Sequence, residues 1–133
     1  MADTGFVVAV VSRRDRDHEV CSAVYTQYSK VLLPQTVLAE VAYLLEKASG
    51  SVAVAKFLVG IDKSRMQLVP IVSEDVHRTA EILMQYADSR IDFVDATVMA
   101  VAERFGIKQV LTLDKRDFQI FRPKHCSSLT LLP

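Results

Sequence analysis

Four short apolar runs along the chain predict the strands of a buried sheet. Each run has the length of a strand and is apolar at most positions, which is typical of a parallel sheet covered on both faces. The runs are Lys30–Leu33, Met66–Val72, Gln109–Leu113 and Leu129–Leu132. Helical segments fill the intervals between them, so strand and helix are expected to alternate.

Two of these intervals have the apolar spacing of helices that turn one face to a core. The first stripe is Val37, Val41, Leu44, Leu45 and Ala48, and the second is Val94, Val98, Val101, Ala102 and Phe105. Ser49-Gly50 and Gly106 follow the two stripes and are expected to end the helices, since glycine tolerates the left-handed backbone of a helix end.

Three further helices are expected at His18–Tyr28, Val52–Ile61 and Ser73–Ala87, with Ser73 as the cap of the last. Alternating strands and helices predict an α/β sandwich around a mainly parallel sheet. The length of 133 residues fits a single domain over residues 1–133.

The charge balance excludes two classes of protein. Lys and Arg number 16, as do Asp and Glu, which argues against a disordered polyelectrolyte and against a uniformly basic nucleic-acid coat protein. No apolar run approaches a membrane span and no secretory signal is visible, so a cytoplasmic location is expected. Cys21 and Cys126 are then expected to be free thiols.

Four acids stand where an α/β sheet builds its sites. Asp3 and Asp114 come directly after predicted strands, and ligands of open α/β sheets bind at the carboxyl ends of strands. Glu40 and Asp95 flank the two apolar helix stripes, about 80° from the centre of each. A carboxylate beside a buried face needs a cationic side chain, backbone donors or a metal ion as its partner.

Each acid also has a purely structural interpretation. Asp92 and Asp95 resemble a capping box, Asp3 suits a turn, Asp114 can cap Lys115–Phe118, and Glu40 can pair with a cation. The four together favour a shared site, because converging carboxylates need a countercharge. Mg²⁺ or Mn²⁺ suits such oxygen ligands and can assist hydrolysis of a phosphodiester. His18, His77 and His125 have no metal-site spacing, and no phosphate loop is present.

The segments that carry these acids resemble the PIN-domain nucleases, and most of all the VapC-type toxins of prokaryotic toxin–antitoxin pairs. They are Asp3-Thr4-Gly5, Glu40 within LAEVAYLL, Asp95 within DFVDATVMAVAERFGI and Asp114 within LTLDKRDF. The resemblance covers essentially the whole chain. It implies a three-layer α/β/α sandwich with a mainly parallel sheet of about five strands, and an acidic pocket that binds Mg²⁺ or Mn²⁺ and cleaves RNA.

The resemblance also implies roles for single residues. Asp3 and Asp95 match the principal metal ligands, Asp114 the acid that completes the site, and Glu40 the acid that holds the metal or orients its water. An auxiliary acid and two hydroxyl groups that support the carboxylates are matched by Asp117, Thr4 and Thr112. Family members have several apolar residues before the first Asp. Here that strand is reduced to Met1-Ala2, which predicts a truncated strand and a loosely held Asp3.

Basic residues near the acids are candidates for phosphate contacts with an RNA substrate. They are Arg13, Arg14 and Arg16 after the first helix, and Lys115, Arg116, Arg122 and Lys124 after Asp114. A solvated charged loop is the alternative for each. The resemblance further implies a cognate antitoxin protein and a homodimer. The Val52–Ile61 helix is apolar enough for such an interface, or for the core.

Two functions therefore remain open. The first is a metal-dependent ribonuclease, the toxin of a type II toxin–antitoxin system. The second is a catalytically silent PIN-fold module that binds RNA or a partner. A phospho-receiver domain, which also joins acids to a parallel sheet, lacks its paired acids after the first strand and its Lys after the fifth.

Overall fold

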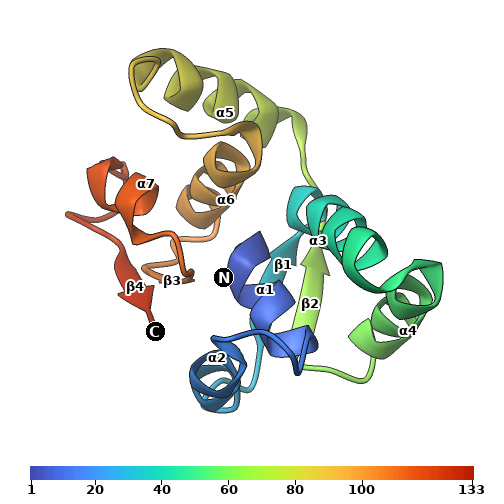
Figure 1. Cartoon of the computed structure of the whole chain (residues 1–133). Helices are drawn as coiled ribbons and strands as arrows, with labels where there is room; N and C mark the ends of the chain where they lie inside the picture. The colour runs from blue at the N-terminus through green and yellow to red at the C-terminus, as the bar shows by residue number, and fades with distance from the viewer.

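Seven helices alternate with four short strands in the computed structural model, which describes residues 1–133 (Figure 1). The strands are β1 (Val31–Pro34), β2 (Met66–Val69), β3 (Gln109–Leu111) and β4 (Thr130–Leu132). Strands β2, β3 and β4 lie within predicted apolar runs, and β1 extends one residue beyond its run, to Pro34. Strand β2 ends earlier than predicted, at Val69, because Pro70 has no N–H group to continue the ladder.

The strands form two parallel pairs that the first three residues join. Val31 of β1 lies opposite Met66 of β2, and Gln109 of β3 lies opposite Thr130 of β4. Between the pairs, the Ala2 N–H donates to the Leu32 carbonyl at 3.0 Å, and the Asp3 N–H donates to the Leu111 carbonyl at 3.0 Å.

This segment takes the place of a short first strand and forms a single parallel bridge, between Ala2 and Leu111. It completes the parallel order β2, β1, residues 1–3, β3, β4, which accounts for the expected sheet of about five strands.

The helices occupy the predicted intervals. They are α1 (Thr4–Val11), α2 (His18–Tyr25), α3 (Gln35–Ser49), α4 (Ser51–Ile61), α5 (Ser73–Gln85), α6 (Phe93–Arg104) and α7 (Lys115–Ile120). Gly50 and Gly106 have φ angles of 77° and 63°, the left-handed conformation expected at the ends of α3 and α6. None of the helices has the length and apolar character that a membrane crossing requires.

The prediction that Ser73 caps α5 is wrong. Val72 occupies the cap position, and its N–H donates to Asp75 Oδ2 at 3.1 Å, so the carboxylate of the first turn supplies the acceptor. Ser73 is the first helical residue.

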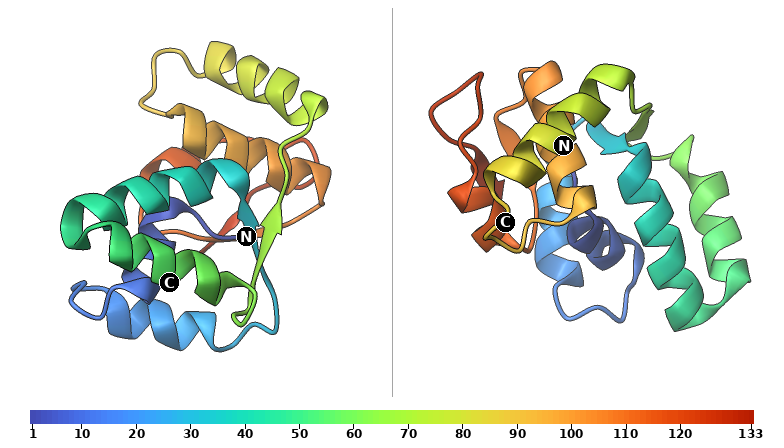
Figure 2. Two further views of the ribbon diagram at one scale, coloured as in Figure 1. Left: turned by 90° about the vertical axis from the view of Figure 1, so that its right-hand side faces the viewer. Right: turned by 90° about the horizontal axis from the view of Figure 1, so that it is seen from above.

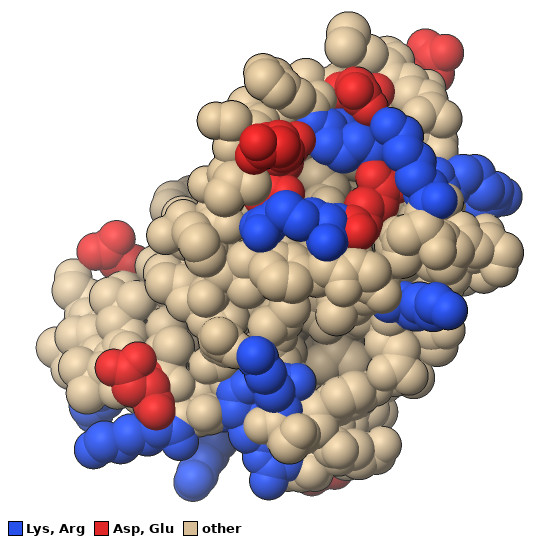
Figure 3. All heavy atoms as spheres, turned by 180° about the vertical axis from the view of Figure 1, so that it is seen from behind, with Lys and Arg blue, Asp and Glu red and all other residues tan.

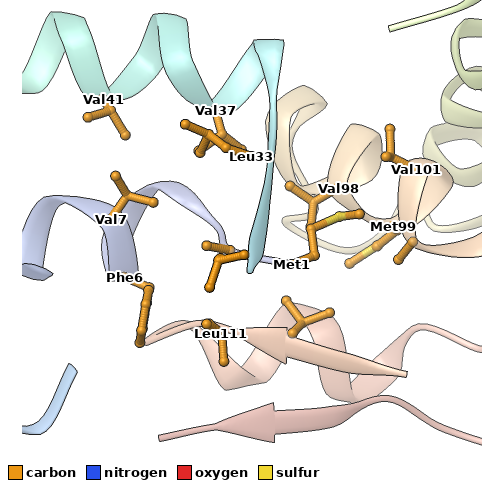
Figure 4. Packing of buried hydrophobic residues seen from close by; sticks show 14 of the residues in the cluster. Met1, Phe6, Val7, Leu33, Val37, Val41, Val98, Met99, Val101 and Leu111 are labelled. Atoms are coloured by element: carbon orange, nitrogen blue, oxygen red, sulfur yellow. The ribbon is translucent and has the colours of Figure 1, made fainter. Parts of the chain in front are cut away.

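One apolar core lies around the first residues of the chain. Helix α1 packs on α2 and α3, α3 also contacts α6, and α5 packs on α6 (Figure 2). Met1 lies between Leu33 of β1 and Leu111 of β3, close to Val98 of α6 (Figure 4). The N-terminal segment is therefore held by both halves of the sheet.

Three residues of the predicted core stripes face solvent instead. Ala48 lies in the last turn of α3, and Phe105 lies beyond the end of α6, where the Arg104 guanidinium covers its ring at 4.5 Å. Leu44 of α3 is 37% exposed, because it lines a cavity rather than the core.

Candidate active site

Asp3 follows the first strand directly and caps helix α1. The Phe6 N–H donates to its Oδ1 at 2.9 Å, and the Thr112 hydroxyl donates to its Oδ2. With its own N–H bound to Leu111, the residue is 4% exposed. The expectation of a loosely held Asp3 is therefore wrong, since backbone and side chain are both fixed despite the short strand.

Glu40 lies in the second turn of α3 and faces the start of α1. Its Oε2 accepts a hydrogen bond from the Thr4 hydroxyl at 2.5 Å. No Lys or Arg forms an ion pair with it. The alternative of a simple ion pair at Glu40 is thus not what the structure shows.

Asp95 lies in the first turn of α6. The predicted capping box is only half formed: the Asp95 N–H donates to Asp92 Oδ1 at 2.9 Å, while the Asp95 carboxylate makes no return bond. Asp114 precedes α7 without a side-chain capping bond, and its N–H donates to the Thr112 hydroxyl at 3.0 Å. Neither carboxylate is used to cap a helix.

All four predicted acids line one open cavity of about 440 Å³ at the carboxyl end of the first strand and β3. The lining consists of Asp3, Thr4, Gly5, Glu40, Leu44, Asp95, Leu113 and Asp114. It contains no basic side chain. A Cβ at Gly5 would lie 3.9 Å from the Leu113 Cβ and 4.0 Å from Asp3 Oδ1, which are ordinary van der Waals distances.

The crowding of acids changes their acidity. Burial raises the pKa of Asp3 to about 6, with smaller contributions from the charges of Asp114 and Glu40, against the hydrogen bonds from Thr112 and Phe6. Burial also raises the pKa of Asp95 to about 8, followed by the charges of neighbouring acids, first of all Asp92. Both carboxylates lack a countercharge.

This donor set has the chemistry of a site for a hard divalent cation. Oxygen ligands, negative charge and the absence of a basic lining residue all favour such an ion. No three acidic, His or Cys side chains lie close enough to bind one ion together. The residues therefore suit an ion held by one or two carboxylates and otherwise by water, which is the usual arrangement for Mg²⁺.

Other predicted residues lie around the cavity or away from it. Asp117 is buried and is absent from the lining, and its Oδ1 accepts a hydrogen bond from Arg116 Nη2 at 2.9 Å. The charge of Asp117 contributes to the raised pKa of Asp95. Arg116 itself is exposed on α7. Arg13 and Arg14 follow α1, whose eight residues span about 12 Å and start at the cavity (Figure 1). The structure therefore places both arginines at the far end of that helix.

Three lining residues were not anticipated from the sequence as parts of the site. Gly5, Leu44 and Leu113 complete the cavity walls. Leu44 carried a usable signal, because it lies four residues after Glu40 and so on the same side of α3.

The likenesses to known proteins agree with this geometry. The curated protein Ribonuclease VapC26 of Mycobacterium tuberculosis is 26% identical over 132 residues, which is 98% of each chain. The solved structure of VapC20 of Mycobacterium tuberculosis, described as a sarcin-ricin loop cleaving toxin, has 24% identity and a TM-score of 0.75 over 82% of this chain and 85% of that one.

A second solved structure, VapBC2 of Rickettsia felis bound to a promoter DNA fragment, matches with a TM-score of 0.72. Its identity is 14%, and the match covers 100% of this chain and 98% of that one. Both solved structures establish a shared fold. The PIN domain family matches residues 1–122, which is most of the sequence and includes all four acids of the cavity. The chain therefore belongs to the PIN domain family.

Proposed function

We propose that the chain is a metal-dependent endoribonuclease and the toxin of a type II toxin–antitoxin system. One observation carries the proposal: four carboxylates from distant segments of a PIN domain line a single cavity without a basic residue. The alignment with a protein named Ribonuclease VapC26 along nearly its whole length supports RNA as the substrate.

The hydrogen bonds of the four acids suggest a separate role for each pair of them. Asp3, fixed by Thr112 and the Phe6 N–H, and Asp95, whose carboxylate accepts no hydrogen bond, would hold the cation. A bound Mg²⁺ or Mn²⁺ would supply countercharge and polarise a phosphoryl oxygen. Glu40 is oriented through Oε2 by Thr4, which leaves Oε1 free to accept a hydrogen bond from water. Asp114 adds a further carboxylate to the cavity lining.

The decisive experiment compares cleavage of labelled RNA by the wild-type chain and Asp95→Asn. Cleavage should require Mg²⁺ or Mn²⁺ and stop in EDTA, and Asp95→Asn should lower the rate at least about 100-fold. Asp62→Asn, an exposed acid at the end of α4, is the matched control and should keep full activity. Full activity of Asp95→Asn, or cleavage that persists in EDTA, contradicts the assignment.

One observation favours the second candidate, a silent PIN-fold binding module. The acids are too far apart for three of them to bind one ion together. Calorimetric titration with Mn²⁺ separates the two functions. Binding that disappears in Asp95→Asn supports the nuclease, whereas binding that is absent from wild type or equal in both proteins supports the silent module.

The proposed toxin role implies an antitoxin, a second copy of the chain and an RNA substrate as binding partners. A cognate antitoxin and a homodimer are expected, and Arg116, exposed beside Asp114, is proposed to contact a substrate phosphate. Arg13 and Arg14 remain candidates only for a substrate long enough to reach the far end of α1. Light scattering of the purified chain tests the homodimer directly.

A further inference from the structure

A second cavity, larger than the cavity of the four acids (the acid cavity), lies at the opposite edge of the sheet. Its volume is about 630 Å³. Lys30 directly precedes β1, Lys108 directly precedes β3, and Thr130 begins β4, and all three line it. We call it the amino-end cavity, because it opens where these strands begin, whereas the acids follow strand ends. The two cavities share no lining residue.

The floor of the amino-end cavity is apolar and belongs to the core of the domain. It is formed by Met1, Val31, Leu32, Ile107 and Leu111. Met1, Val31 and Leu111 are buried, and Leu32 and Ile107 are half-buried. Cavities of several hundred Å³ with an apolar lining and a few polar groups are typical binding sites for small molecules. A ligand that covers this floor needs an uncharged, apolar or flat part.

The rim of the amino-end cavity is polar, and its only charges are positive. It consists of Tyr28, Lys30, Lys108, Gln109 and Thr130. Lys30 and Lys108 are exposed and form no ion pair, and no Asp or Glu lines the cavity. The Tyr28 hydroxyl donates to Gln109 Oε1 at 3.2 Å, which leaves the Gln109 amide nitrogen free to donate to a ligand. The charge of this rim is opposite to that of the acid cavity.

The floor and the rim together define the chemistry of a ligand. Two lysines without an acidic partner suit a group with up to two negative charges, and a phosphate monoester carries about 1.5 to 2 at neutral pH. The Tyr28 ring and the apolar floor suit a flat ring system, since aromatic side chains stack on the faces of bases. Gln109 and Thr130 offer hydrogen bonds to the heteroatoms of such a ring. A nucleoside monophosphate combines the anionic group, the flat ring and the hydrogen-bonding atoms in one small molecule.

We propose that the amino-end cavity is a binding site for a free nucleoside monophosphate. The phosphate is held by Lys30 and Lys108, and the base lies against Tyr28 and the apolar floor. The site is separate from the proposed ribonuclease function, because it uses none of the four acids and no metal ion.

Isothermal titration calorimetry of the full chain with AMP tests the proposal. EDTA is present throughout, so that AMP cannot bind to a cation in the acid cavity. Adenosine, which lacks the phosphate, and inorganic phosphate, which lacks the base, are titrated in parallel. AMP should bind at least about tenfold more tightly than either, because only AMP uses the rim and the floor at once.

The lysines provide a matched pair of variants. Lys30→Ala/Lys108→Ala should weaken AMP binding at least about tenfold and leave the weak binding of adenosine unchanged. Lys47→Ala/Lys63→Ala removes the same charge from two exposed positions outside the cavity and should bind AMP like wild type. All four positions are exposed, so the melting temperatures of both variants should equal that of wild type.

The aromatic wall is tested separately. Tyr28→Ala should weaken AMP binding about tenfold and leave inorganic phosphate binding unchanged, whereas Tyr28→Phe keeps the ring and should stay within about threefold of wild type. If Tyr28→Ala does not fold, Tyr28→Phe and the lysine variants still decide the question.

Four results would overturn the proposal. They are no AMP binding by wild type, equal AMP affinity of Lys30→Ala/Lys108→Ala and wild type, inorganic phosphate binding as tight as AMP binding, and adenosine binding as tight as AMP binding. The third result would show that the floor is not used, and the fourth that the lysines are not. RNA cleavage by the wild-type chain is measured independently, so none of these results bears on the nuclease assignment.

Discussion

Two groups of acids in this chain have the same residue types and opposite surroundings. The cavity acids Asp3, Glu40, Asp95 and Asp114 have no basic partner. Three acids of the α5–α6 hairpin, Asp75, Glu81 and Glu103, are instead paired with cations. Arg78 Nε lies 2.6 Å from Glu103 Oε2, and Arg104 Nε lies 2.9 Å from Asp75 Oδ1. On the rear face, blue and red side chains alternate over the upper part of the molecule (Figure 3).

The difference appears directly in acidity. In the α5–α6 pairs, burial raises the pKa of Glu103, but the hydrogen bonds from Arg78 and the Lys124 N–H outweigh it, and the pKa is lowered. In the cavity, burial and neighbouring acids raise the pKa of Asp3 and Asp95. An acid that is paired with a cation in the folded protein contributes to stability. An acid that is partly buried without a cation is a candidate for a functional site.

The same substitution in the two groups should separate activity from stability most strongly. Glu40→Gln should lower RNA cleavage about 100-fold with little change in stability, because its carboxylate supports the site and has no ion-pair partner. Glu103→Gln should keep kcat and lower the free energy of unfolding by about 2 kcal/mol, because it weakens the bonds to Arg78. Cleavage assays and urea denaturation measure the two effects. Loss of stability in Glu40→Gln together with loss of activity in Glu103→Gln would contradict the distinction between the two groups of acids.

Removal of a cation from the paired group should have the next largest effect. Arg104→Met leaves the carboxylate of Asp75, 1% exposed, without its ion-pair partner, and should lower the free energy of unfolding by about 2 kcal/mol. Arg16→Met removes the partner of Asp17 at the surface and should change stability by less than about 0.5 kcal/mol. Equal urea midpoints for the two variants would show that burial of the pair has no energetic consequence.

The pH dependence of stability should show the smallest effect, with a definite sign. A raised pKa in the folded state means that folding favours the protonated acid, so this contribution is complete below pH 3.8 and is lost as pH rises toward 8. Metal-free Asp95→Asn cannot titrate at this position and should be more stable than metal-free wild type at pH 8 by about 1 kcal/mol. Melting temperatures in EDTA at pH 6 and pH 8 test this, and parallel profiles of the two proteins would contradict it.

The sequence predicts the acids of the site better than it predicts what surrounds them. Asp3 and Asp114 follow strands, Glu40 and Asp95 flank helix stripes, and the structure brings these four acids to one cavity. The fixing of Asp3 depends on Thr112, which is 109 residues away and belongs to another strand end. No local pattern reveals such a bond, so the expected looseness of Asp3 was wrong.

Helical periodicity also fails where a stripe meets a cavity. Leu44 has the spacing of a core residue but turns toward open space, because the core ends where the acids begin. In the same way, Arg13 is only ten residues from Asp3 in the sequence, but helix α1 lies between them and separates Arg13 from the cavity by the length of the helix. The alternation of strands and helices along the chain does predict the parallel sheet, because general rules for connecting such elements favour this topology without knowledge of individual side-chain contacts.

The short first strand also has a consequence for the order of events during synthesis. Asp3 is synthesised more than one hundred residues before Leu111 and Thr112, which hold it. Glu40 can meet Thr4 early, yet the far wall with Asp95 and Asp114 does not exist until those residues have been made. The acid cavity is therefore complete only after Asp114 has been made, so the metal site assembles late in synthesis although its first ligand is made early.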